Sequence, residues 1–145
     1  MKPALLAPIL LTAGLGLGGG TAYGVHTLLP PAAGAPAKPK AETTSFTPTG
    51  KILAPLVLTD GRLSGYVSFE VQLETGETDV EFVTARMPML LNAINMRTFR
   101  TPMAAGPDGM LPDLEQFRRV VMVAANEAFG PRMVRRAVIT QATPA

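Results

Sequence analysis

The chain has 145 residues, a formal net charge of +2, no cysteine and one histidine. The lack of cysteine excludes disulfides, thiolate nucleophiles and cysteine-ligated zinc, and His26 lies in the apolar N-terminal segment, so the rest of the chain cannot form a histidine-based triad or a two-histidine metal site. From Lys51 onward ten Lys and Arg residues balance ten Asp and Glu residues, so the composition does not indicate nucleic-acid binding.

The N-terminal segment predicts a membrane anchor. Residues 4–29 contain no Lys, Arg, Asp or Glu, and a helix of this length, at about 1.5 Å per residue, crosses a hydrocarbon core about 30 Å thick. Lys2 precedes the segment, which favours a short cytoplasmic end at residues 1–3. A cleaved signal peptide with its apolar region at residues 4–17 is the alternative.

Glycines within this predicted span form small-xxx-small spacings that let two helices approach closely. The candidate helix-packing residues are Gly14 with Gly18, and Gly16 with Gly20. The alternative is a glycine-rich anchor without a helical partner. Residues 30–50 follow, rich in Pro, Ala and Lys, and we predict a disordered tether because they cannot bury enough apolar surface to order themselves.

Residues 51–59 and 63–74 predict a β-hairpin. Apolar and polar residues alternate strictly from residue 63 to residue 74, as in a strand with one buried and one exposed face. Asp60-Gly61 between the two runs favours a tight turn. The residues expected to face the core are Leu63, Gly65, Val67, Phe69, Val71 and Leu73.

Two helical patterns follow the hairpin. Residues 78–81 have the form of a capping box, and apolar residues then recur at helical spacing up to Ile94, interrupted by Pro88, which predicts a kink or two short helices. Asp113 is the predicted cap of a later helix that Gly130 and Pro131 terminate. Residues 133–141 then predict a short strand at the edge of the sheet.

The segment between these helices, residues 98–111, has no period and predicts a loop of functional length. Its apolar side chains either fold back on the core or meet a partner. The candidate partner contacts are Phe99, Met103 and Met110 in this segment and the basic pair Arg118 and Arg119 in the helix after it.

The order of these elements, together with the segments at residues 66–74, 86–94 and 138–141, resembles the flagellar basal-body-associated FliL-like family of bacterial inner-membrane proteins. The predicted fold class is α+β, a small antiparallel sheet packed with two or three helices after one N-terminal transmembrane helix. The resemblance implies a stomatin-like periplasmic domain at residues 51–145. It further implies a homo-oligomeric, non-enzymatic scaffold without a cofactor, which binds the flagellar stator or basal body and supports motility.

Other functions stay open. The alternative scaffold is a membrane-anchored adaptor or chaperone-like module with another integral-membrane partner, using methionines at 87, 89, 96, 103 and 110 as an adaptable groove. An enzyme would depend on carboxylates alone, either Glu70 with Glu74 or Asp108 with Asp113. Alternation along the strand and the capping position of Asp113 give these groups structural roles instead.

Overall fold

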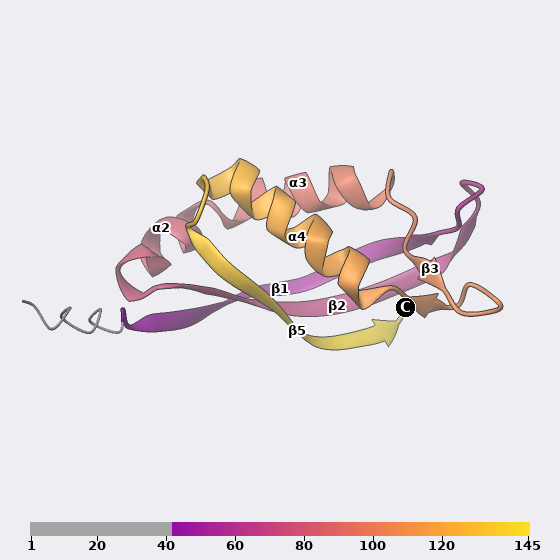
Figure 1. Cartoon of the computed structure of the whole chain (residues 1–145), viewed down its shortest axis with the longest axis horizontal. Coiled ribbons are helices and arrows are strands. Elements are labelled where there is room, and N and C mark those ends of the chain that lie inside the picture. The colour runs from indigo at the N-terminus through magenta and orange to yellow at the C-terminus, as the bar shows by residue number, and fades with distance from the viewer. Residues whose placement is uncertain (1–41) are drawn as a thin grey trace, which may run out of the picture. The chain divides into compact units, whose positions relative to one another are not determined.

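The computed structural model describes residues 42–145, and in this part an antiparallel sheet carries helices on one of its faces (Figure 1). The three-stranded sheet has the order β1 (Thr44–Val57), β2 (Leu63–Gly76), β5 (Val134–Pro144). The helices are α2 (Val80–Ala85), α3 (Met87–Thr98) and α4 (Leu114–Phe129), with a 3-10 turn η2 (Glu77–Asp79) before α2. The predicted α+β class with a hairpin and a C-terminal strand is therefore confirmed.

The predicted anchor at residues 4–29, its glycine pairs and residues 30–41 of the predicted tether lie outside the described residues. Among residues 42–145, no helix combines the length and the apolar character that a membrane span requires.

Strand β2 lies in the centre of the sheet and buries every second residue from Val67 to Thr75. Val67, Phe69, Val71 and Leu73 are at most 2% exposed, which confirms the predicted alternation. Burying each such side chain contributes about 1.5–3 kcal/mol. Leu63 was predicted to face the core and is 53% exposed, because the hairpin extends beyond the region that the helices cover.

Strand β1 begins earlier than the sequence indicated. The predicted disordered tether extended to residue 50, but residues 44–50 belong to β1, and residues 44–48 pair with β2, where Phe46 lies opposite Glu74 and Pro48 opposite Gln72. Alternate threonines make this possible: Thr47 and Thr49 are buried, and the Thr49 hydroxyl donates a hydrogen bond to the Val71 carbonyl at 3.2 Å. The prolines are tolerated because β1 is an edge strand.

The β1–β2 turn has the predicted location. The N–H of Gly61 donates to the carbonyl of Leu58 at 2.9 Å, and Gly61 has a φ of 85°. Asp60 stabilises the turn from its side chain, because its carboxylate accepts hydrogen bonds from the backbone N–H and from Nε of Arg62. The backbone hydrogen bond, followed by the side-chain one, lowers the pKa of the Asp60 carboxyl below its usual value of 3.8.

The helices α2 and α3 are separate, as Pro88 predicted. Pro88 lies in the first turn of α3. Backbone N–H groups in the first turn have no acceptor within the helix, so a proline there costs no helical hydrogen bond. The predicted capping box at residues 78–81 is wrong, since neither η2 nor α2 has a side-chain cap. The chain instead enters α2 through the 3-10 turn, with the Asp79 carboxylate close to Gly76.

Helix α4 closes the core and has the predicted ends. The Asp113 carboxylate accepts the N–H of Gln116 at 2.9 Å, and Gly130 follows the last helical residue with a φ of 98°. The apolar side of α4 packs on the sheet and on α3, burying Phe117, Val120, Val121, Ala124, Ala125, Ala128 and Phe129.

Strand β5 forms the second edge of the sheet, as predicted, and extends to Pro144. Its register with β2 shifts between Glu74 and Thr75, which leaves Arg135 as an extra residue opposite the central strand. Both Arg135 and Arg136 are therefore exposed, and they form ion pairs with Glu42 and Glu74 respectively.

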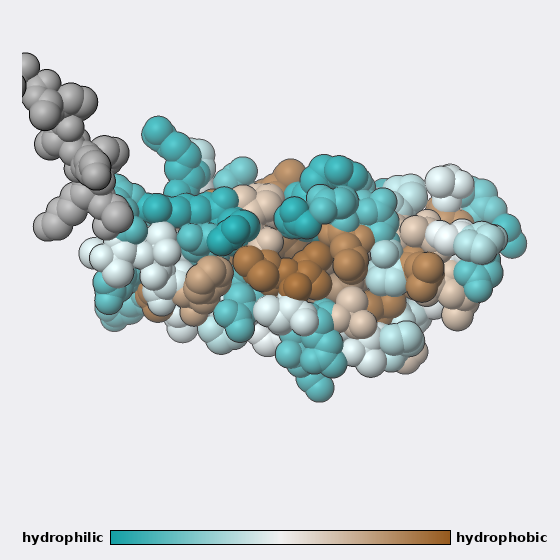
Figure 2. Space-filling model, turned by 60° about the horizontal axis from the view of Figure 1, so that its bottom comes forward, coloured by the Kyte–Doolittle hydropathy of each residue, from teal (hydrophilic) through white to brown (hydrophobic). Residues whose placement is uncertain are grey.

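The face of the sheet away from the helices is less apolar than the face that the helices cover. Phe46, Leu53 and Tyr66 are exposed on it, but Lys51 lies opposite Glu70, and Glu74 pairs with Arg136. Figure 2, turned toward this side of the molecule, shows an apolar area bounded by hydrophilic residues.

Candidate interaction surfaces

The segment after α3 is fixed to the end of the hairpin through Met103. The N–H of Met103 donates to the carbonyl of Val57 at 3.0 Å, and its own carbonyl accepts the N–H of Asp113 at 2.8 Å. Its side chain is 1% exposed. The prediction that Met103 contacts a partner is therefore wrong, because this residue joins the loop to the core.

Between Met103 and Asp113 the chain forms a small hairpin, which the sequence did not predict. Its strands are β3 (Ala104–Ala105) and β4 (Leu111–Pro112), and Gly106 and Gly109 in its turn have φ values of 82° and 69°. A Cβ on Gly109 would lie 2.6 Å from a methyl carbon of Leu58, so a larger residue would require the Leu58 side chain to shift, in addition to the strain of the positive φ, where this turn meets the β1–β2 turn.

Three apolar side chains project from this joined structure. Leu63 is 53% exposed, Met110 is 55% exposed and Leu111 is 60% exposed. The hydroxyl of Ser64 lies 3.6 Å from the Met110 sulfur, and the Asp108 carboxylate accepts the N–H of Met110 at 3.2 Å. We call Leu63, Met110 and Leu111 the apolar tip, because they lie at the end of the sheet that carries the β1–β2 turn (Figure 1).

The apolar tip is held in place by backbone geometry. Two positive-φ glycines, the close approach of Gly109 to the Leu58 side chain and two backbone hydrogen bonds at Met103 fix the loop that carries Met110 and Leu111. Because the backbone of this loop is already ordered, binding at the tip loses little backbone entropy, which favours association. Met110 was a predicted partner contact, whereas Leu63 had been expected in the core.

The other predicted contact residues are dispersed. Phe99 follows α3 and is 62% exposed. Arg118 forms an ion pair with Glu115 at 2.6 Å, and Arg119 donates from Nε to the Gln116 side chain at 3.0 Å. Such (i, i+3) pairs are typical of an exposed helix surface. Within residues 42–145, neither arginine forms a hydrogen bond or an ion pair with Met110 or Phe99.

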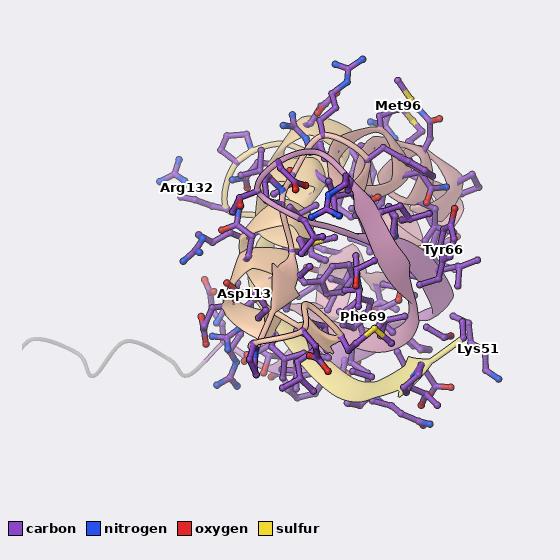
Figure 3. The ribbon with its side chains drawn as sticks, turned by 90° about the vertical axis from the view of Figure 1, so that its right-hand side faces the viewer. Lys51, Tyr66, Phe69, Met96, Asp113 and Arg132 are labelled. Atoms are coloured by element: carbon purple, nitrogen blue, oxygen red, sulfur yellow. The ribbon has the colours of Figure 1, made fainter. Side chains whose placement is uncertain are left out.

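A polar groove that the sequence did not indicate lies at the opposite end of the sheet. It has a volume of about 350 Å³ and is lined by Glu42, Glu77, Asp79, Arg132 and Arg135, among others. Arg132 has a φ of 66° and projects away from the body of the protein (Figure 3). The two arginines in this groove nearly balance its three carboxylates. Arg135 forms an ion pair with Glu42.

The carboxylates considered for catalysis have structural roles. Asp113 caps α4, Asp108 stabilises the turn before Met110, and Glu74 pairs with Arg136 at 2.9 Å. Glu70 and Glu74 are four residues apart on β2, which separates them by about 13 Å along an extended strand. In residues 42–145 no cluster of three His, Cys, Asp or Glu side chains could hold a metal ion.

No protein-family model matches this sequence, and no curated protein is significantly similar to it.

Proposed function

We propose that this protein is a non-enzymatic, membrane-anchored scaffold of the FliL-like type. In this proposal residues 4–29 anchor the chain in a bacterial inner membrane, and a stomatin-like domain in the periplasm forms homo-oligomers. The domain binds stator or basal-body components of the flagellar motor and so supports motility.

The observation that carries the binding function is the apolar tip. Leu63, Met110 and Leu111 are each more than half exposed, although the loop beneath two of them is fixed by glycine geometry and hydrogen bonds. We infer a contact site here from the gathering of three such residues at one end of the sheet, since an exposed apolar patch marks an interaction site between proteins. The structural roles of Asp113, Asp108 and Glu74 also favour a function based on contact.

The charge around the tip favours a protein partner. Asp60 and Arg62 form an ion pair at 2.7 Å next to Leu63, and Asp108 binds the backbone beside Met110. The surroundings of the tip are thus neutral to acidic, which disfavours an anionic lipid surface as its ligand.

The second candidate is an envelope adaptor or chaperone-like module with another membrane partner. It is favoured by the exposure of Met89, Met96 and Met110, each between 54% and 55% exposed. Flexible thioether side chains adapt to partners of different shape. However, the groove beside Met96 also contains Arg97, Arg100 and Glu127, so it differs from a purely apolar channel for lipid.

In-cell photo-crosslinking of the full chain tests the proposal. A photoreactive amino acid at Met110 should give adducts with flagellar stator or basal-body proteins, while the same amino acid at Glu115, on the polar side of α4, should give few. Adducts with unrelated envelope proteins would establish the second candidate. If Met110 gives no adduct and deletion of the gene leaves motility unchanged, the scaffold proposal fails.

A further inference from the structure

Helix α3 is apolar on two opposite sides. Its inner side buries Leu90, Ala93 and Ile94 against the core. Its outer side carries Met89 at 55% exposure and Met96 at 54%, and Phe99 directly after the helix is 62% exposed. These three exposed side chains give the outer side of α3 an apolar stripe beside the polar Asn92 and Asn95, and such a stripe on a helix can pack against another helix.

The exposed residues on this side have regular spacing. Met89, Asn92, Met96 and Phe99 follow one another at intervals of three, four and three residues, which is the a/d spacing of a helix that packs against another helix. We call these four residues the α3 seam. Asn92 is exposed, and Figure 3 shows Met96 at the outer border of the molecule, directed away from its body.

The charges beside the α3 seam are basic. Arg86 before the helix lies over the Phe82 ring at 4.3 Å, Arg100 follows the helix, and neither has a carboxylate partner within residues 42–145. Helix α3 itself contains no Asp or Glu. A groove of about 290 Å³ beside Met96 is lined by Arg97 and Arg100, and its one carboxylate, Glu127, is bound to Arg97 at 2.6 Å.

We propose that the α3 seam docks an amphipathic α-helix of another protein, with apolar residues facing Met89, Met96 and Phe99 and with Asp or Glu on its flanks. The inference rests on the proposed function as a binding scaffold and adds the chemical class of one partner. Helix-in-groove recognition uses anchors at this spacing, and Arg86 and Arg100 at the two ends of the seam select an acidic helix by charge complementarity.

Two other occupants fit less well. A twofold pairing of α3 with the α3 of a second copy would bring Arg86 of one copy to Arg100 of the other, with no carboxylate on either helix to compensate. A membrane-surface helix usually exposes a broad apolar face, whereas this seam has two residues per heptad and includes Asn92.

Binding of designed peptides to the full chain tests the inference. Two synthetic helices share one leucine seam and differ in their flanks, which carry Glu in one and Lys in the other. The Glu-flanked peptide should bind, and Met96→Glu should weaken its binding by about 10- to 100-fold, as expected for loss of a central anchor. Val123→Glu is the matched control, since Val123 is an apolar residue 47% exposed on α4 and outside the seam.

Charge reversal provides the second variant. Arg100→Glu should shift preference toward the Lys-flanked peptide, while thermal unfolding of each variant, followed by circular dichroism, should match the unchanged protein. The inference is overturned if the Glu-flanked peptide does not bind, if both peptides bind equally, or if Met96→Glu abolishes only self-association. Met96-dependent binding to phosphatidylglycerol vesicles in place of the peptide would also overturn it. Because crosslinking at Met110 does not involve the seam, its outcome separates failure of this inference from failure of the scaffold proposal.

Discussion

The ring of Phe117 on α4 stacks on the ring of Phe69 on β2, with centroids 3.7 Å apart and planes 14° from parallel. Both side chains are 0% exposed. This pair connects the helical layer to the central strand, so the position of α4 and of the loop that leads into it depends on this contact.

Phe117→Ala should lower the free energy of unfolding by about 3–5 kcal/mol, because it removes a buried ring and leaves a cavity against Phe69. Urea unfolding followed by circular dichroism measures the change. Val123→Ala on the exposed side of the same helix is the control and should cost less than about 0.5 kcal/mol. Equal losses for the two variants would contradict the packing of Phe117 against Phe69 in the core.

Asp113→Ala should cost about 1 kcal/mol, because the N–H of Gln116 loses its side-chain acceptor at the first turn of α4. Asp113→Asn keeps an acceptor oxygen and should retain most of the stability. Amide hydrogen exchange at Gln116 should rise in the alanine variant and change little in the asparagine variant. A similar loss in both would indicate that charge, and not capping, is the important property.

Comparison of Gly109→Ala with Gly61→Ala separates the cost of a positive φ from the cost of a close contact with Leu58. Both glycines have positive φ, but a Cβ at residue 61 meets no atom within 4 Å, whereas one at residue 109 would lie 2.6 Å from Leu58. Gly61→Ala should therefore cost about 1–2 kcal/mol from backbone strain alone. Gly109→Ala should cost more and should also disturb the NMR signals of Leu58 and Met110. Equal costs would show that the Leu58 side chain moves aside without a measurable loss of stability.

The pKa of the Asp60 carboxyl should lie below its usual value of 3.8, because the N–H and then the side chain of Arg62 stabilise its charged form. A pKa lowered in the folded state adds stability that is present above the unfolded pKa and is lost as the pH falls through the folded pKa. NMR titration of the Asp60 carboxyl measures this directly. Arg62→Gln should restore the pKa only in part, since the backbone N–H, which is the larger cause, remains. Full restoration would assign the effect to the guanidinium.

The sequence by itself determined the features that depend on neighbouring residues. The alternation over residues 67–73 defined the buried face of β2, Pro88 separated α2 from α3, and Asp113 capped α4, because side-chain periodicity, a missing N–H and a capping oxygen all act within a few residues. The resemblance to the FliL-like family stays a prediction.

The tertiary structure alone decided which loop residues reach the surface. Met103 and Met110 are both methionines of one aperiodic segment, yet the first is buried beside Val57 and the second is exposed beside Ser64. The sequence periodicity likewise did not predict the bulge that exposes Arg135 or the exposure of the outer side of α3. In each case the outcome depends on contacts with a segment distant in the chain, and local periodicity contains no information about such contacts.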